Sequence, residues 1–143
     1  MTLAIDADVL VHWLATGAER HRAVNDLLKR EIANGVKLGL VPQVACECLH
    51  VVTDRRRFSR PPSFPEATER LLEIWMGREV ERIQPDPRVP ERTFELLTEH
   101  SLGRKRILDT ALAATLELAG IQRLATLNGR DFQIFPFLEI VEP

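Results

Sequence analysis

Short apolar runs alternate with helical patterns along the chain, and this alternation constrains the fold more than any other feature of the sequence. Each run is bounded by polar or breaking residues, which is typical of buried strands. No tight Asn-Gly or Asp-Gly turn joins two alternating runs into a hairpin. The sequence therefore predicts one α/β domain over residues 1–143, with three α/β/α layers and a mostly parallel central sheet. The expected strands are Thr2–Ile5, Val36–Val41, Val80–Ile83, Arg123–Thr126 and Leu138–Val141.

The segments between these runs have the apolar spacing of amphipathic helices. In Ala18–Gly35, apolar residues recur every three or four positions, and Asn34 and Gly35 are expected to end the helix. Pro42 suits the first turn of a following helix, because the N–H that proline lacks is not needed there. The residues from Asp54 to Pro65 are rich in arginine and proline and predict an exposed loop. Further helices are expected at Gln43–Thr53, Glu66–Met76, Pro90–His100 and Ile107–Ala119.

The overall charge excludes a protein that binds nucleic acid through a bulk positive field. Nineteen Lys and Arg stand against 21 Asp and Glu, so the net charge is −2. Cys46 and Cys48 point to different sides of their predicted helix, so they cannot form a disulfide framework, and a reducing cytoplasm is expected. The apolar start is interrupted by Asp6 and Asp8 and has no basic segment before it. We therefore expect no signal peptide and no membrane span.

Acidic and polar residues follow the predicted strands repeatedly. In a parallel sheet the carboxyl ends of the strands meet at one edge, where ligands bind. Carboxylates converging there would suit Mg²⁺ or Mn²⁺, which prefer oxygen ligands. The candidates are Asp6 and Asp8 after the first strand, Glu47 one turn into the next helix, Asp109 at the start of the Ala-rich helix, and Asn128 and Asp131 after the fourth strand.

Each of these residues also has an ordinary structural interpretation. Aspartate is a preferred N-cap, which would explain one of Asp6 and Asp8 but not both. Glu47 could be a boundary residue of its helix, and Asp131 a loop acid. Asp109 borders apolar positions one and two turns along its helix, so its charge needs compensation from a cation or from first-turn backbone N–H groups.

Several common chemistries lack their motifs. Cys46, Cys48 and His50 lie too close together on one helix to give zinc a tetrahedral site. The chain has no phosphate-binding G-x-x-x-x-G-K-[ST] loop, no dinucleotide-binding G-x-G-x-x-G and no G-x-S-x-G nucleophile elbow. Nucleotide-driven motors, dinucleotide enzymes and serine hydrolases are therefore disfavoured.

The chain resembles the PIN-domain ribonucleases and, among them, the VapC toxins of bacterial toxin–antitoxin pairs. The matching segments span nearly the whole chain in the family's order. They read IDADVLVHWL, VPQVACECLHVVTD, RILDTALAATLELAGIQRLATLNGRDF and LEIVEP. The resemblance implies a PIN-like α/β/α fold and a metal-dependent endoribonuclease that hydrolyses RNA phosphodiester bonds. It also implies a homodimer and a VapB-like antitoxin that covers the acidic pocket.

The family's site residues carry over position by position. Its metal-binding and catalytic acids correspond to Asp6, Glu47, Asp109 and Asp131. Its supporting polar positions correspond to Asp8, Thr126 and Asn128, and Asp8 stands where the family usually has Asn. The resemblance implies that these acids hold Mg²⁺ or Mn²⁺, which activates water for attack on the phosphodiester.

Basic residues that could bind the RNA backbone fall in two clusters. Charge runs of this kind can equally be solvated loops, so the clusters are candidates for RNA binding and no more. One comprises Arg55, Arg56, Arg57 and Arg60, and the other comprises Arg104, Lys105 and Arg106.

Two other functions remain open. The Asp6-Ala7-Asp8 triplet also resembles the nucleophile and acid of haloacid-dehalogenase phosphatases, which additionally require a lysine from later in the chain. The other possibility is a catalytically degenerate PIN fold that binds RNA or protein without cleaving it. Chelation of divalent metal would stop a nuclease and leave such binding unchanged.

Overall fold

The computed structural model describes residues Met1–Pro143 and has a five-stranded sheet at its centre. The strand order is β3-β2-β1-β4-β5, and every neighbouring pair is parallel. The parallel sheet predicted from the sequence is therefore confirmed. The strands are β1 (Thr2–Ile5), β2 (Lys37–Leu40), β3 (Val80–Arg82), β4 (Arg123–Ala125) and β5 (Glu139–Val141).

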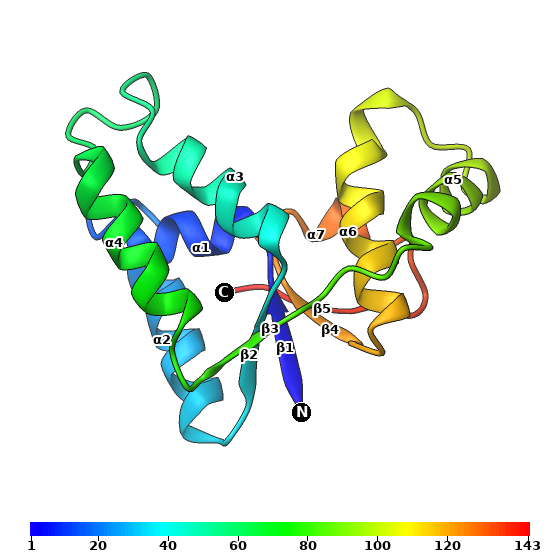
Figure 1. Cartoon of the computed structure of the whole chain (residues 1–143), viewed down its shortest axis with the longest axis horizontal. Helices are drawn as coiled ribbons and strands as arrows, with labels where there is room; N and C mark the ends of the chain where they lie inside the picture. Colours follow the sequence, from blue (N-terminus) through cyan, green and yellow to red (C-terminus); the bar gives the residue numbers. More distant parts are fainter.

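The helices cover the two faces of this sheet (Figure 1). One layer contains α1 (Ala7–Leu14), α2 (His21–Ala33), α3 (Pro42–Val52) and α4 (Phe64–Trp75), which pack against one another. The other contains α5 (Val89–Glu99) and α6 (Ile107–Leu118), joined by the short α7 (Gly129–Phe132). This arrangement confirms the three-layer α/β/α fold.

Local sequence signals set the ends of several helices. Asp6 caps α1 by accepting a hydrogen bond from the Ala7 N–H at 2.8 Å. Pro42 is the first residue of α3, as the sequence predicted. Gly35 and Gly120 follow the ends of α2 and α6 with φ angles of +80° and +73°, a backbone conformation that glycine adopts without strain.

The central strands are buried on both faces, which fixes the positions of the residues that follow them. Leu3 and Ile5 in β1 and Leu124 in β4 are almost completely inaccessible to solvent. Gly39 in β2 is tightly enclosed, since a β-carbon there would lie 2.9 Å from both Ile83 Cδ1 and Thr2 Cγ2. A larger residue at this position would have to push the Ile83 and Thr2 side chains aside. Helix α3 begins at Pro42, and only Val41 lies between the strand and this helix.

The structure differs from the sequence predictions at a few boundaries. The helix expected from Ala18 begins at His21, and its predicted first residues form a turn. Arg104–Arg106 form a 3₁₀ turn before α6, and α7 was not predicted. None of the helices has the length and hydropathy needed to cross a membrane.

Candidate active site

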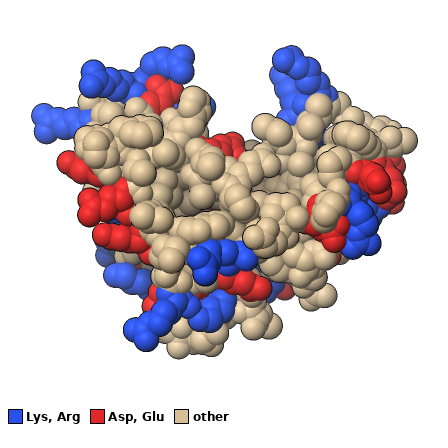
Figure 2. Space-filling view, in the orientation of Figure 1, with Lys and Arg blue, Asp and Glu red and all other residues tan.

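A cleft opens at the carboxyl ends of the strands, between α3 and the start of α6. The space-filling view shows a hollow at this edge with acidic atoms at its floor (Figure 2). Lys and Arg side chains gather on both sides of the hollow, over the α3–α4 connection and over the turn before α6. The cleft thus combines an acidic floor with basic rims.

Three of the predicted carboxylates meet at a small cavity in this cleft. Asp6 comes from the end of β1, Glu47 from α3 and Asp109 from the first turn of α6. The cavity has a volume of about 20 Å³, which is room for about one water molecule. Its remaining walls are formed by Val41, Gln43, Val44, Leu108, Leu112 and Thr115.

Asp6 is held by hydrogen bonds on both carboxylate oxygens. Oδ1 accepts from the Ala7 N–H at 2.8 Å, and Oδ2 accepts from the Thr126 hydroxyl at 2.8 Å. Burial nevertheless raises the pKa of Asp6 to about 6, with further increases from the charges of Asp8 and Glu47. Asp6 is therefore both the cap of α1 and a charged group in an unfavourable environment.

Asp109 lies half-buried on the opposite wall of the cavity. Burial raises its pKa to about 6, and the charges of Asp6 and Asp131 raise it further. Asp109 accepts no capping hydrogen bond, although it lies in the first turn of α6. Neither Asp6, Glu47 nor Asp109 forms an ion pair with a Lys or Arg side chain. The negative charges of the three carboxylates are therefore not neutralised by ion pairs within the protein.

Asp8 points toward the loop after β4 instead of lining the cavity. Both of its oxygens lie within 3.3 Å of the Leu127 N–H, which donates to them. Burial raises the pKa of Asp8, and the Leu127 hydrogen bond opposes the increase. This contact ties the start of α1 to the segment that carries Thr126 and Asn128.

Thr126 connects Asp6 to the same loop. Its side chain is fully buried, and its hydroxyl donates to Asp6 Oδ2 while accepting from the Asn128 N–H at 3.0 Å. Asn128 is exposed at the start of α7, and its side chain forms no capping hydrogen bond. The structure therefore places Thr126 in contact with the Asp6 carboxylate and Asn128 outside the cavity.

Asp131 also lies outside the cavity lining, where it is paired with Arg106. One guanidinium nitrogen of Arg106, Nη1, lies 3.8 Å from Asp131 Oδ1. The other, Nη2, donates to the Asp131 backbone carbonyl. Arg106 thus joins the start of α6 to α7, while its neighbours Arg104 and Lys105 are exposed.

The α3–α4 loop carries the other basic cluster on the protein surface. Arg55, Arg57 and Arg60 are exposed and make no ion pair, whereas Arg56 pairs with Asp54 at 3.2 Å. The loop also lines a surface hollow of about 620 Å³ that includes Arg55 and Phe64. The predicted loop is present up to Ser63, whereas Phe64 and Pro65, which were also predicted to belong to it, begin α4. Its free arginines lie on one rim of the cleft.

The donor set of the cavity suits a hard divalent cation. All three converging side chains are carboxylates, and two of them have raised pKa values because their charges are buried together. No three His, Cys, Asp or Glu side chains lie close enough together to hold a metal ion directly. Mg²⁺ commonly takes one or two carboxylates and keeps several waters, so this spacing is compatible with it.

Some residues that line the cavity were not predicted from the sequence. Gln43 lies one helical turn before Glu47 and shares the cavity, which its spacing of four residues on the predicted helix could have indicated. Leu108 and Thr115 complete the wall of α6 without any clear signal in the sequence. No lysine lines the cavity, so the phosphatase interpretation lacks the cation it requires.

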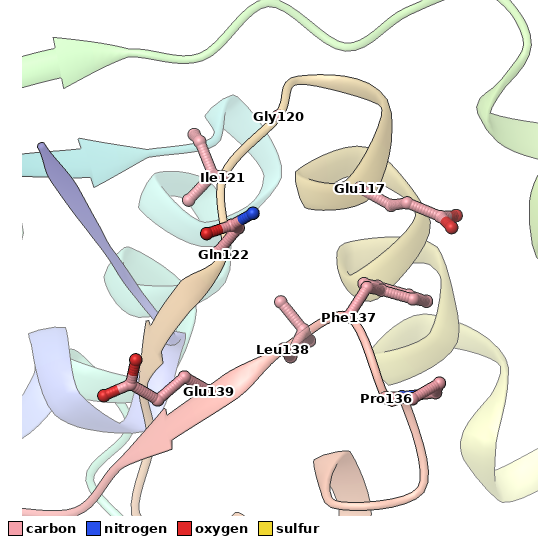
Figure 3. A pocket seen from close by; sticks show the side chains of 8 residues that line it. All are labelled: Glu117, Gly120, Ile121, Gln122, Pro136, Phe137, Leu138 and Glu139. Carbon is pink, nitrogen blue, oxygen red and sulfur yellow. The ribbon is translucent and has the colours of Figure 1, made fainter.

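Another hollow, of about 410 Å³, lies at the end of the sheet opposite the carboxylate cavity (Figure 3). Its lining includes Glu117, Gln122 and Glu139, and the side chains of the two glutamates diverge. Glu117 is already paired with Arg92 at 2.6 Å. None of the site residues predicted from the sequence lies there.

Comparison with known proteins gives matches over nearly the full length of the chain. No protein-family model matches the sequence. Ribonuclease VapC24 of Mycobacterium tuberculosis is 26% identical over 141 residues, covering 99% of this chain and 96% of that protein.

Among solved structures, VapBC2 from Rickettsia felis, bound to a promoter DNA fragment, matches with a TM-score of 0.72 and 16% identity, covering 100% of this chain and 99% of the matched one. Mycobacterium tuberculosis VapC20, described as a sarcin-ricin loop cleaving toxin, matches with a TM-score of 0.72 and 18% identity, covering 99% of both chains. These structural matches show that the chain shares the fold of the VapC proteins, and the VapC24 match over nearly the whole chain agrees with the resemblance found in the sequence.

Proposed function

We propose that this protein is a divalent-metal-dependent endoribonuclease and the toxin of a toxin–antitoxin pair. The observation that carries the proposal is the cavity in which Asp6, Glu47 and Asp109 meet without an ion pair to any basic side chain. The match to a curated ribonuclease over 99% of the chain supports the same activity. RNA is the substrate and Mg²⁺ or Mn²⁺ the cofactor in this proposal.

The residues of the cleft have separate tasks in this mechanism. Asp6, Glu47 and Asp109 would hold the ion, at most two of them directly and the rest through its bound waters. When bound, the ion would supply an activated water and stabilise charge on the leaving oxygen. Thr126 fixes the orientation of Asp6 through its 2.8 Å hydrogen bond. The rigid start of α6 positions Asp109 opposite Asp6. Because the floor is acidic, the basic rims are needed to hold the RNA backbone over it.

The direct test is RNA cleavage by the purified protein, free of any antitoxin. We expect discrete cleavage of a labelled RNA pool with Mg²⁺ or Mn²⁺ and none with EDTA. An Asp109→Asn protein prepared identically controls for contaminating ribonuclease. Equal cleavage by this variant, or no cleavage with either metal, would favour a degenerate module that only binds RNA or protein.

Asp8→Ala is expected to reduce cleavage less than Asp6→Ala. Asp8 holds the Leu127 N–H, whereas Asp6 lines the cavity. Loss of Asp8 should therefore loosen the loop after β4, at a cost of about 10-fold in activity, the range seen when a supporting contact of a metal site is removed. Asp8→Asn keeps an acceptor for Leu127 and should retain more activity than Asp8→Ala. Measuring metal affinity for both alanine variants checks the ranking, which equal losses would contradict.

The free arginines of the α3–α4 loop are expected to bind RNA phosphates. Changing Arg55, Arg57 and Arg60 to Gln should raise KM about 10-fold and flatten its salt dependence, with kcat unchanged. The matched control changes Arg22, Lys29 and Arg30, three exposed basic residues of α2, to Gln. Both variants lose the same charge, so an equal effect of the control would mean that only net charge matters.

The resemblance and the solved neighbours also suggest partners. VapBC assemblies from Rickettsia felis and Haemophilus influenzae share the fold, with TM-scores of 0.72 and 0.69. We propose that this chain binds a VapB-like antitoxin that covers the acidic cleft, and that it forms a homodimer. A toxin that cleaves cellular RNA would act in the cytoplasm, where its substrate is.

A further inference from the structure

Arg106 belongs to a basic cluster that was expected to lie on the surface, but its environment is unusual for an exposed arginine. Its side chain is only 24% exposed, and it reaches α7 instead of solvent. Its Nε atom is buried and has no hydrogen-bond partner. A buried donor without an acceptor is rare in folded proteins and costs free energy, so it requires an explanation.

Asp131 holds this guanidinium from one side only. Its carboxylate lies 3.8 Å from Nη1, a long ion pair, while its backbone carbonyl accepts from Nη2. Both contacts involve the terminal nitrogens, so the edge of the guanidinium that carries Nε stays unpaired. The three carboxylates at the cavity are Asp6, Glu47 and Asp109, and Asp131 is not among them.

We propose that Asp131 is a positioning residue for Arg106, and that Arg106 binds an RNA phosphate beside the metal-binding carboxylates. This inference rests on the proposed ribonuclease function. It gives Asp131 a task that differs from the metal ligation implied by the family resemblance. Asp6, Glu47 and Asp109 would then be the carboxylates that hold the metal, directly or through its bound waters.

The chemistry of the group fits a phosphate better than the alternatives. Guanidinium donors bind phosphate oxygens in pairs. The Arg106 side chain is 24% exposed while Nε is buried, so the donors that a phosphate can reach are the terminal nitrogens, which carry two N–H groups each. Arg106 lies three residues before Asp109, and its charge opposes the increase in the pKa of Asp109, although Arg106 does not line the cavity. It also precedes α6, whose amino-terminal dipole favours an anion. Arg104 and Lys105 are exposed and unpaired, so they lack this fixed orientation.

The competing explanation is that the pair only ties α7 to α6. A tie of this kind predicts lost stability and a general loss of activity when either partner is changed. Phosphate binding by an oriented arginine predicts a specific rise in KM. It also predicts that the two residues act as one unit, so that losing both costs no more than losing Arg106 alone.

The test compares Asp131→Asn, Arg106→Met, their combination and Arg106→Lys, with Arg30→Met, at an exposed position of α2 outside the cleft, as the control. Mn²⁺ affinity is measured by calorimetric titration without RNA, and KM and kcat are measured with saturating Mg²⁺. We expect Asp131→Asn to keep Mn²⁺ affinity within about 3-fold of wild type, because one outlying charge is screened. Asp109→Asn should weaken Mn²⁺ binding by at least about 30-fold. Loss of a supporting contact already costs about 10-fold or more in metal affinity, and loss of a direct ligand should cost more.

Arg106→Met and Asp131→Asn should each raise KM by about 10-fold or more, and the combined variant should match Arg106→Met. Arg106→Lys, which keeps the charge but not the paired donors, should fall between wild type and Arg106→Met. Arg30→Met should change KM by less than about 3-fold, as expected for one exposed charge outside the cleft. Thermal melting confirms that each variant is folded, and Asp131→Asn, which preserves shape, still tests the inference if Arg106→Met does not fold.

Loss of Mn²⁺ affinity in Asp131→Asn comparable to that in Asp109→Asn would overturn the inference, because Asp131 would then be a ligand. Additive effects of Asp131→Asn and Arg106→Met on KM would also overturn it. If the wild-type protein cleaves no RNA, the proposed function and the phosphate contact both fail. The Mn²⁺ titration then still decides separately whether Asp131 is a metal ligand.

Discussion

Replacing Asp6 by Asn is expected to stop RNA cleavage while making the metal-free protein more stable. The loss of activity should be at least about 100-fold, the upper end of what a supporting contact of a metal site contributes, because Asp6 is proposed as a direct ligand. The free energy of unfolding should rise by about 2 kcal/mol at pH 7.5. The pKa of Asp6 is about two units higher in the folded protein than in the unfolded chain, and the corresponding free energy is reduced because Asp6 keeps some contact with solvent. Activity and stability should thus change in opposite directions.

The physical reason is that the Asn side chain keeps the contacts of Asp6 and removes only its charge. Asparagine is as good an N-cap as aspartate, so the Ala7 N–H retains its acceptor. The Thr126 hydroxyl can accept from the new amide in place of donating to the carboxylate. The repulsion from Asp8 and Glu47 that raises the pKa of Asp6 disappears with the charge.

Urea unfolding without metal and single-turnover cleavage with Mg²⁺ measure the two effects. Asp26→Asn is the matched control, since Asp26 is exposed on α2 and outside the cleft. It should change neither quantity. An Asp6→Asn protein that cleaves RNA at the wild-type rate would remove Asp6 from the site. One that is less stable than wild type would make Asp6 a structural residue.

The fold could be predicted from the sequence because its strands are short and continuous in apolar character. Thr2–Ile5 and Val36–Val41 indicate buried parallel strands, and β1 and β2 lie within them. The start of α2 could not be predicted in the same way. The Arg20 N–H donates to His12 Nδ1 of α1, so a tertiary contact sets this boundary and no local pattern reveals it.

The convergence of the three cavity carboxylates also follows from the sequence, through topology. Strands β1 and β2 are parallel neighbours, so Asp6 and the start of α3 lie at one edge, and α6 brings Asp109 to it. The direction of Arg106 does not follow. Arg104, Lys105 and Arg106 form one run of charge in the sequence, and only the contact with Asp131 turns Arg106 inward.

The metal-free protein is expected to lose stability as the pH rises from about 4 to about 6 through the contributions of Asp6 and Asp109. Both have a pKa of about 6 in the folded protein and about 3.8 when unfolded. Between these values the folded state binds more protons, so raising the pH favours unfolding, and the loss levels off once the pH has passed about 6. The combined loss should be about 3 kcal/mol, with the contribution of half-buried Asp109 reduced for solvent screening.

Thermal unfolding of wild type and of the Asp6→Asn, Asp109→Asn double variant across this pH range isolates the two carboxylates, because the other titrating groups are common to both proteins. The stability of wild type relative to the variant should fall with rising pH and level off above pH 6. Mg²⁺ at pH 7.5 should raise the Tm of wild type by about 8 °C at 100 times its Kd and leave the variant unchanged. A relative stability that rises with pH would mean that these carboxylates are favourably paired in the folded protein, and the cavity would then have no electrostatic need for a cation.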